Sequence, residues 1–414
     1  MQNIQEKEAY IIGSARTAIG SFGGSLSSFS ATELGSIALK GALQRSGVGA
    51  EQVESIYLGN VISANLGQNP ARQVAIGAGC AEDKVVGTTV NKVCASGMKA
   101  VALAAQEIRS GDSEIVVVVG TESMSNVPYY APSNRFGARY GNQSILDGLV
   151  RDGLSDAFNG EAMGYAAEKC AADYSITRDD QDNYAVKSYE RAIAASTNNK
   201  TQPEIVDAVV KGRHGKPDTV INKDEEILKF DAARLRALRV AFPSKADRSG
   251  TVTAGNASSL SDGAAALVLV SGKKLKELKA SGVLASSHIY HVSSWADAEQ
   301  QPVDFTTSPA KAIPKALAKI GAEIDSVDFF EINEAFSAVA IANQKILGLD
   351  NEKLNVYGGA VAIGHPLGCS GARIIVTLCN VLAQHKDSNG AKRGVAAVCN
   401  GGGGASAIVI DLCS

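Results

Sequence analysis

Cys94 is the residue of this chain whose setting best suits a nucleophile. It lies in NKVCASGMKA, after an extended segment, 88–93, and before an Ala-rich stretch, 96–109, with apolar residues at helical spacing. This order places Cys94 at a helix N-terminus, where free backbone N–H groups and the helix dipole favour an anion. We therefore expect its pKa to fall below the roughly 8.5 of a free thiol. The alternative is a buried, inert cysteine in a tight turn.

A second cysteine, Cys399, leads into a run of glycines. The sequence VAAVCNGGGGASA carries a buried strand into Gly401–Gly404. Backbone N–H groups of such a loop can point at a ligand without side chains in the way. No Lys-Ser/Thr pair follows, which argues against a phosphate-binding P-loop. An oxyanion site for a carbonyl fits better, and a plain glycine-rich turn around a buried cysteine is the alternative.

One histidine and one asparagine complete the candidates. Of the five histidines, only His365 is set among glycines and followed by proline, in GGAVAIGHPLGCSG. It could activate a thiol, or it could be a structural turn residue. Asn333 lies in FFEINEAF, between a hydrophobic strand and a helix. Its amide could hold a catalytic water or simply cap the helix.

Composition places these residues in an ordinary globular protein. The chain has 414 residues, 45% hydrophobic and 20% charged, with a net charge of -3. That length allows two or three domains, and the charge predicts neither nucleic acid nor an anionic membrane as a partner. No segment resembles a membrane span, a signal peptide or an Arg-rich presequence, and the final DLCS does not match a peroxisomal SKL. We therefore expect a cytoplasmic location, or a mitochondrial one if a presequence has been removed.

The cysteine pattern fits a reducing compartment. There are seven cysteines, an odd number, and no C-x-x-C spacing occurs. This argues against a disulfide framework or a zinc site. Most of the seven should be small buried hydrophobic residues.

Buried strands alternate with helical patterns, which predicts an α/β protein. The runs 115–119, 267–270, 395–398 and 407–410 are continuously apolar, as expected for sheets covered by helices on both faces. The chain also repeats itself: Gly47 matches Gly321 and Gly97 matches Gly371, each pair 274 positions apart. We interpret this as two copies of one α/β unit, with a long insertion in the first copy.

Together the motifs identify a family. NKVCASG, NEAF, GGAVAIGHPLG and CNGGGGASA occur in that order and resemble the thiolase family over essentially the whole chain, in particular its acetoacetyl-CoA thiolases. The resemblance implies a five-layered α-β-α-β-α core built from two similar halves. It places the N-terminal half at 1–125 and 250–272, a CoA-binding loop domain at 126–249, and the C-terminal half at 273–414. It also implies an acyltransferase, acetyl-CoA C-acetyltransferase, that condenses two acetyl-CoA molecules reversibly.

The resemblance assigns a role to each catalytic candidate. Cys94 matches the nucleophile that takes the acyl group, and His365 matches the base that activates it. Cys399 matches the acid/base that removes a proton from the attacking acetyl-CoA. A water on Asn333 with the His365 side chain resembles one oxyanion site, and the backbone N–H groups of Cys94 and Gly401 resemble the other. Two such sites are needed because no side chain here is basic enough to remove the α-proton unaided.

Binding residues also follow from the resemblance. The positions matching the family's contacts with CoA are Leu154, Met163, Tyr189, Lys229, Phe230, Asp231, Arg234, Phe242, Ala257, Ser258 and Phe336. One subgroup binds potassium through a Tyr hydroxyl and backbone carbonyls, and the matching positions are Tyr189, Ala254, Gly255, Ala257 and Val361. Oxygen ligands suit such a hard cation. The family also implies acetyl-CoA, acetoacetyl-CoA and CoA as ligands, no redox cofactor, a homotetramer, and a role in supplying isoprenoid or sterol synthesis.

Three other functions compete with this interpretation. A degradative 3-ketoacyl-CoA thiolase of broader chain length is disfavoured by NEAF and CNGGGGASA. A ketoacyl synthase with the same core would lack a cysteine in the glycine-rich C-terminal loop, so Cys399 opposes it. A non-catalytic lipid-binding or scaffold protein of the same fold would not need all four catalytic positions.

Overall fold

Two α/β halves with the same strand order build the core of the protein. A computed structural model describes residues 4–212 and 215–413. The first half contains β1 (Ala9–Thr17), α1 (Ala31–Ser46), β3 (Ser55–Gly59), α2 (Pro70–Gly77), β4 (Val86–Val90), α3 (Ser96–Ser110), β5 (Ile115–Ser123) and β11 (Ser261–Ser271). The second contains β12 (Tyr290–Glu299), α8 (Pro309–Ala318), β13 (Phe329–Ile332), α9 (Ser337–Leu347), α10 (Ala360–Ile363), α11 (Leu367–Asn389), β14 (Arg393–Asn400) and β15 (Gly404–Leu412).

The strand order confirms the predicted repeat. In the first half, β3 is parallel to β5, β5 is antiparallel to β11, and β11 is antiparallel to β1. In the second half, β13, β14, β15 and β12 follow one another in the same senses. A short antiparallel pairing of β1 with β12 joins the two sets of strands into one sheet path. The late strand β11 lies next to β5 and completes the first half, as the sequence predicted.

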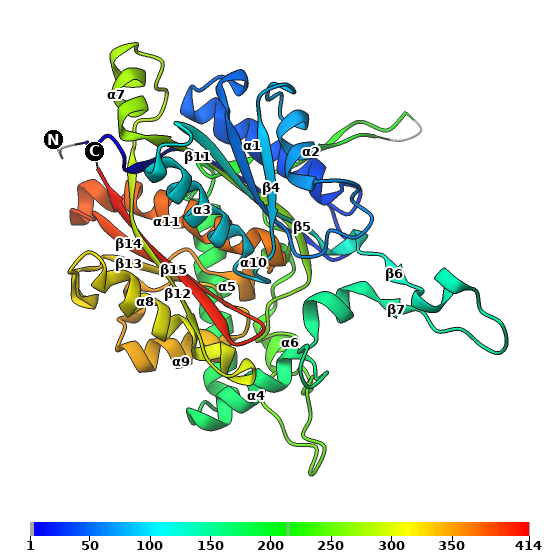
Figure 1. Ribbon diagram of the computed structural model, residues 1–414. Helices are drawn as coiled ribbons and strands as arrows, with labels where there is room; N and C mark the ends of the chain where they lie inside the picture. The colour runs from blue at the N-terminus through cyan, green and yellow to red at the C-terminus, as the bar shows by residue number, and fades with distance from the viewer. Residues whose placement is uncertain (1–3, 213–214, 414) are drawn as a thin grey trace.

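Helices cover both faces of each set of strands, giving five layers (Figure 1). The central layer holds α3 and α11, which pack against each other and against β5 and β14. The outer face of the first half is covered by α1 and α2, and that of the second half by α8. Burial on both faces explains why β5 and β11 are apolar without alternation. The predicted thiolase architecture is therefore confirmed.

Helix α11 owes its composition to this central position. Its residues are apolar on nearly every face, and Gly390 ends it in the left-handed conformation. Among the described residues it is the one helix long and apolar enough to cross a membrane. However, 83% of that stretch is buried inside the protein, as in the core helix of a globular domain.

The two central helices meet at equivalent glycines. A Cβ atom on Gly97 would lie 2.8 Å from the backbone nitrogen of Ala372, and one on Gly371 would lie 2.5 Å from that of Met98. Both distances are too short for any side chain. The backbones of α3 and α11 therefore touch one turn beyond Cys94 and six residues beyond His365.

A long segment is inserted between β5 and β11. Its elements are β6 (Tyr129–Tyr130), β7 (Leu146–Asp147), α4 (Met163–Asp173), α5 (Arg178–Thr197), β8 (Ile205–Val206), β9 (Ala208–Val210), β10 (Thr219–Ile221) and α6 (Ala232–Arg236). Figure 1 shows β6 and β7 extending away from the core as an arm. Buried Arg16 on β1 anchors the insertion, because its guanidinium lies 2.8 Å from Glu204 and 2.7 Å from Asp224. Outside these elements lie β2 (Gly20–Ser21) and α7 (Gly272–Ala280).

Candidate active site

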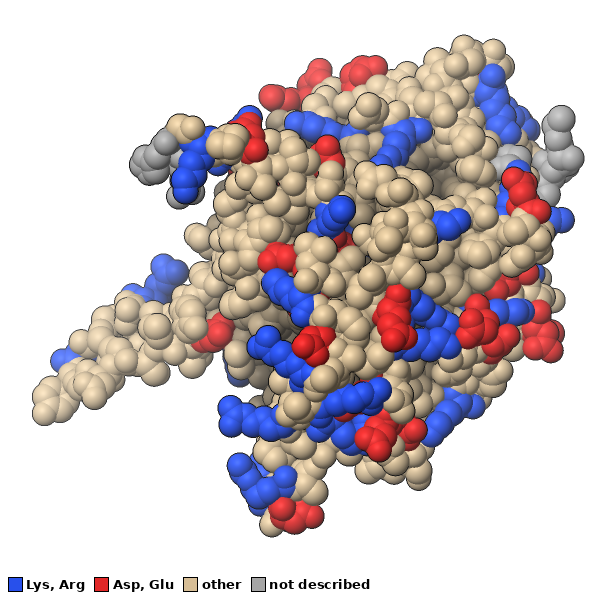
Figure 2. Space-filling view, turned by 180° about the vertical axis from the view of Figure 1, so that it is seen from behind, with Lys and Arg blue, Asp and Glu red and all other residues tan. Residues whose placement is uncertain are grey.

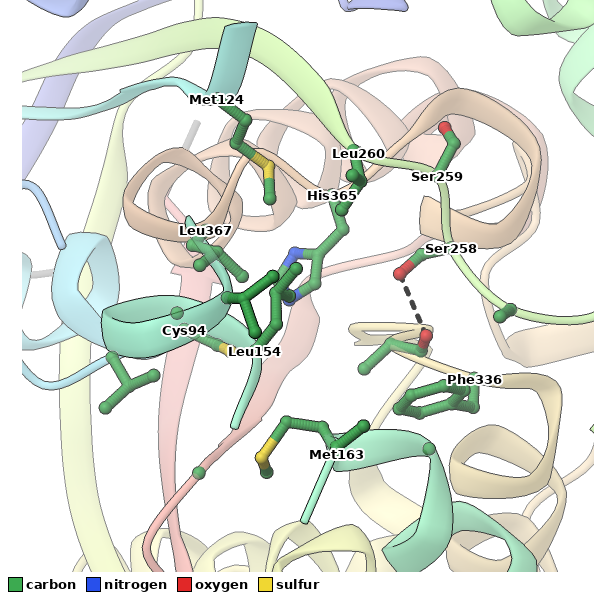
Figure 3. Close-up of a pocket in the computed structure, with 18 of the residues that line it drawn as sticks. Cys94, Met124, Leu154, Met163, Ser258, Ser259, Leu260, Phe336, His365 and Leu367 are labelled. Carbon is green, nitrogen blue, oxygen red and sulfur yellow. Dashed lines mark hydrogen bonds between the residues drawn. The ribbon is translucent and has the colours of Figure 1, made fainter. Parts of the chain in front are cut away.

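A cavity of about 300 Å³ lies where the two halves and the insertion meet. Cys94 comes from the first half, His365 and Gly401 from the second, and Leu154 and Met163 from the insertion. Figure 3 shows the Cys94 sulfur and the His365 ring pointing into this space from different elements. The wall is almost entirely apolar apart from a few side chains, as in many small-molecule sites.

Cys94 lies between β4 and α3, two residues before α3 begins, as predicted, but its pKa is not lowered. Only 9% of the residue is exposed, and this burial raises the pKa of the thiol to about 11. The backbone N–H groups of Gly401 and of Cys94 itself lower that pKa, yet they do not offset the lost solvation. The expected low-pKa thiolate is therefore wrong for this enclosed site. The resting group is a neutral thiol, and it needs a base.

His365 is placed and oriented to be that base. Its Nδ1 lies 2.5 Å from the Ser370 hydroxyl, which itself donates to the carbonyl of Pro366 at 3.0 Å. A hydroxyl has one proton, so with that proton on Pro366 the Ser370 oxygen accepts from Nδ1–H. This leaves the lone pair on Nε2, a buried atom without a hydrogen-bond partner. A neutral imidazole with a free Nε2 can accept a proton from a thiol.

The electrostatics of His365 give a testable pH dependence. Burial, with a smaller effect from Arg373, lowers the pKa of His365 to about 3, so the ring stays neutral far below its ordinary range near 6.5. As the pH falls, His365 of the unfolded chain takes up a proton near pH 6.5, whereas His365 of the folded protein does so only near pH 3. The folded state is therefore stabilised by the neutral ring above pH 6.5 and loses this stability as the pH falls toward 3. On acidification, we expect kcat/KM for acetoacetyl-CoA cleavage to fall only at a pH well below 6.5. An inactivation midpoint near 6.5, with circular dichroism showing a folded protein, would contradict this.

Asn333 lies beside His365 with one atom unpaired. Its Nδ2 is 3.4 Å from His365 Nδ1, and its Oδ1 is buried without a partner. Its backbone N–H donates to the carbonyl of Ala397 in β14, which holds Asn333 just after the carboxyl end of β13. Buried polar atoms normally have partners. The unpaired atoms of Asn333 and His365 thus mark a place for a polar ligand or water.

Cys399 is near Cys94 but does not line the cavity. It is the next-to-last residue of β14, opposite Ala405, it is fully buried, and it packs among Phe305, Ala335 and Met163. Burial raises its pKa well above the ordinary value, and the neighbouring Cys94 adds to the rise. Both predicted cysteines therefore lie at the site. Cys94 lines the cavity, and Cys399 is buried behind the residues that line it.

Glu122 is a buried carboxylate that the sequence did not single out. It accepts hydrogen bonds from the backbone N–H groups of Val61, Ile62 and Gly368 at 2.9–3.2 Å, and one from Asn60. Burial raises its pKa to about 7 even though these bonds lower it. These contacts tie the start of α11, and with it the loop that carries His365, to the end of β3.

The predicted CoA-binding residues fall into two groups. Six of them line the cavity with Cys94: Leu154, Met163, Phe242, Ala257, Ser258 and Phe336. The others do not line it: Tyr189 is on α5, Lys229, Phe230 and Asp231 precede α6, and Arg234 is within α6. Asp231 caps α6 by accepting from the backbone of Arg234 at 2.9 Å, and Lys229 contacts Ser21 at 2.6 Å. Phe230 stacks on Tyr189 with ring centroids 4.5 Å apart.

The predicted cation ligands also come close together. Tyr189 and Phe230 pack around Leu235 and Val361, and a Cβ on Gly255 would lie 2.8 Å from the Leu235 side chain. Among the hydrogen bonds of residues 4–212 and 215–413, none uses the Tyr189 hydroxyl or the carbonyls of Ala254, Gly255 and Ala257. The Tyr189 hydroxyl and the Gly255 carbonyl are thus uncommitted oxygens of residues at this cluster, and oxygen ligands suit a hard cation.

Several functional positions were missed from the sequence. Met124, Ser259 and Leu260 line the cavity without belonging to any motif used above, and Leu367 lies in the His365 motif but was not singled out. Met124 follows the carboxyl end of β5, which is where ligands tend to bind in α/β sheets, so this position could have been found. Ser370 lies in the His365 motif, but only the folded geometry shows its contact with Nδ1.

Comparison with known proteins settles the family. The family model described as "Thiolase, N-terminal domain" matches residues 9–273, and "Thiolase, C-terminal domain" matches residues 287–412. The chain belongs to the thiolase family. The match to both thiolase domain models, and not the shared core, disfavours a ketoacyl synthase.

Curated relatives of this thiolase cover nearly its whole length. It is 56% identical to "Acetyl-CoA acetyltransferase" of Schizosaccharomyces pombe, over 98% of both chains. It is 53% identical to "Acetyl-CoA acetyltransferase ERG10, cytosolic" of Gibberella zeae, over 97% of this chain and 98% of that one.

Solved structures show the same architecture. The Acat5 thiolase from Ascaris suum in complex with coenzyme A superposes with a TM-score of 0.88 at 42% identity, covering 98% of this chain and 99% of that one. The Bacillus anthracis acetyl-CoA acetyltransferase gives a TM-score of 0.91 at 37% identity, with the same coverage.

Proposed function

We propose that this thiolase is an acetyl-CoA C-acetyltransferase that reversibly condenses two acetyl-CoA molecules into acetoacetyl-CoA and CoA. One observation carries the proposal: Cys94, His365 Nε2 and Gly401 meet in one small apolar cavity. Relatives 52–56% identical over nearly the full chain, named acetyl-CoA acetyltransferases, support the same activity. The Ascaris suum thiolase, which was solved in complex with coenzyme A, supports CoA as the carrier of the acyl group.

The first half-reaction is transfer of an acetyl group to Cys94. The sulfur attacks the thioester carbonyl of acetyl-CoA while its proton moves to His365 Nε2, and the CoA sulfur then leaves with that proton. The thiol pKa is raised and the imidazole pKa is lowered, so a preformed ion pair is disfavoured in the empty site. The proton therefore moves as the attack proceeds, which is general base catalysis. The N–H groups of Cys94 and Gly401 stabilise the carbonyl oxygen.

The second half-reaction forms the carbon–carbon bond. The Cys399 thiol passes its proton to His365 Nε2, and the resulting thiolate takes an α-proton from a second acetyl-CoA. The enolate oxygen accepts hydrogen bonds from the protonated Nε2 and from a water on Asn333. The enolate carbon attacks the acetyl group on Cys94, and the Cys94 sulfur leaves and takes the proton from His365 Nε2, which restores both thiols and the neutral imidazole. Acetoacetyl-CoA is released, and cleavage follows the same steps in reverse.

We assign CoA binding to the insertion, taken as residues 126–249. Lys229, Arg234, Arg236 and Arg239 are all exposed along the segment around α6. Figure 2 shows Lys and Arg side chains gathered over the lower part of one face, although the net charge of the chain is -3. Such a local positive field suits the phosphates of CoA.

Potassium is proposed at the cluster of Tyr189 and the carbonyls of Ala254, Gly255, Ala257 and Val361. We expect thiolysis to run several-fold faster in potassium chloride than in tetramethylammonium chloride of equal ionic strength. Tyr189→Phe should abolish that difference by removing one ligand. Equal rates of the unsubstituted enzyme in the two salts would contradict a cation site.

Assembly and cellular role remain proposals drawn from the family. We propose a homotetramer in the cytoplasm that supplies isoprenoid or sterol synthesis, in keeping with the relative named cytosolic. Sedimentation at micromolar concentration would test the first point, because a stable monomer would contradict it. Fractionation of cells that express the tagged full-length chain would test the location.

Substrate preference separates the proposed activity from degradative thiolysis. We expect kcat/KM for acetoacetyl-CoA to exceed that for 3-ketooctanoyl-CoA by about 10²-fold, because the cavity that Cys94 lines is small, about 300 Å³. Steady-state thiolysis of both substrates with CoA measures the ratio. A ratio near one would favour the broader degradative enzyme.

A further inference from the structure

Two cavities meet beside Cys94, separated by a thin wall. The second cavity has a volume of about 850 Å³ and is lined in part by Tyr130 of β6 and by Leu146 and Asp147 of β7. Part of its lining is apolar, with Val61, Ile62, Ile145 and Leu146. The residues that line both cavities, and so form the wall, are Val93, Val150, Gly153, Met163 and Gly401.

Val93 and Met163 close this wall over Gly401. A Cβ atom built on Gly401 would lie 3.2 Å from Met163 Cε and 3.8 Å from Val93 Cγ1. The tips of two side chains from different elements thus converge on one glycine. Val93 directly precedes the nucleophile, so the wall stands next to the atom that would carry the acyl group.

The backbone of Val93 is strained. Its φ is +48°, and it is the only β-branched residue with a positive φ among residues 4–212 and 215–413. Valine is poorly suited to this region, where glycine and asparagine are the usual residues. Two residues hold Val93 in this conformation. Asn91 Oδ1 accepts a hydrogen bond from Val93 N–H at 2.9 Å, and Ser96 donates to the Val93 carbonyl.

This strain needs an explanation, because backbone geometry alone would favour glycine. A glycine at this position would adopt the same turn at no steric cost, but it would remove the side chain from the wall. The isopropyl side chain of Val93 therefore has a role that glycine could not fulfil. That role is to complete the wall between the cavity that Cys94 lines and the second cavity.

We propose that Val93 is a specificity-determining residue that limits the acyl group on Cys94 by closing the wall to the second cavity. Opening this wall would admit straight-chain 3-ketoacyl-CoA substrates of medium length, with the alkyl tail in the apolar part of the second cavity. The inference rests on the proposed function, in which Cys94 carries the acyl group.

The test compares Val93→Ala with Leu260→Ala. Leu260 lines the first cavity but not the second, so its truncation enlarges the acyl site without opening the wall. We expect the ratio of kcat/KM for 3-ketooctanoyl-CoA to that for acetoacetyl-CoA to rise about tenfold or more in Val93→Ala. The same ratio should change little in Leu260→Ala.

Two results would overturn the proposal. One is an unchanged ratio in a folded Val93→Ala enzyme that still cleaves acetoacetyl-CoA. The other is an equal rise in Leu260→Ala, because volume alone would then explain the change. If Val93→Ala does not fold, Val93→Gly replaces it, since glycine suits the positive φ and also opens the wall. Failure of the unsubstituted enzyme to cleave acetoacetyl-CoA would refute the proposed function instead.

Discussion

Replacing Cys94 by alanine is expected to lower kcat for acetoacetyl-CoA thiolysis by about 10⁴-fold or more. The variant keeps the cavity, His365 and the N–H groups of residue 94 and Gly401, but it has no atom to accept the acetyl group. Intact-protein mass spectrometry after incubation with acetyl-CoA should show one added acetyl group on the unsubstituted enzyme and none on the variant. The two measurements together separate loss of the nucleophile from loss of substrate binding.

Cys80→Ala is the matched control for that experiment. Cys80 is buried, and its pKa is raised to about 11 like that of Cys94, but it packs in the outer core beside α2. We expect its thiolysis rate to stay within about threefold of the unsubstituted enzyme, because surface and core changes away from a site act mainly on stability. A Cys94→Ala enzyme that retained a tenth of the activity would rule out Cys94 as the acyl carrier.

Replacing Cys399 by alanine should separate the two half-reactions. Acetyl transfer to Cys94 needs His365 but not Cys399, so the acetylated enzyme should still form. Turnover in both directions should fall about 10²- to 10⁴-fold, which is the usual range for loss of a general acid or base. Exchange of the methyl protons of acetyl-CoA with deuterated water, followed by NMR, should be lost in parallel.

Cys379→Ala serves as the control for Cys399. Cys379 is also buried, also has a raised pKa, and lies on α11 in the central core, away from the cavity. Thermal unfolding of both variants shows how much of any effect comes from the truncated side chain. Normal proton exchange in Cys399→Ala would assign the α-proton to another group, and loss of acetylation would mean that its role is structural.

Much of this site could be predicted because its chemistry is concentrated in short motifs. Cys94 and His365 were found from a helix start and a Gly/Pro turn, and the structure places both in one cavity. The spacing of 274 residues between Gly97 and Gly371 predicted two halves, because the packing of a repeated unit preserves its glycines. Local sequence was therefore enough to predict the architecture and to single out Cys94 and His365 as candidates.

What could not be predicted depends on distant segments that close over the site. The pKa of Cys94 follows from burial by residues such as Phe305 and Leu367, which are remote in sequence, and this burial reversed the expected direction. No sequence rule places a valine at positive φ, so the conformation of Val93 appears only in the fold. The burial of Cys399 depends on side chains from three separate elements, which include Met163, Phe305 and Ala335.

The backbone contact between α3 and α11 also bears on thermal motion at the site. In any rocking of one half against the other, an atom moves in proportion to its distance from the pivot. Gly97 and Gly371 leave no gap at their contact, so we expect the pivot to lie there. Cys94 and His365 are a few residues from this pivot, so they should move little. The insertion is farther from the pivot and should move more. The fold can therefore let substrate in at the periphery while the sulfur and the imidazole keep their separation.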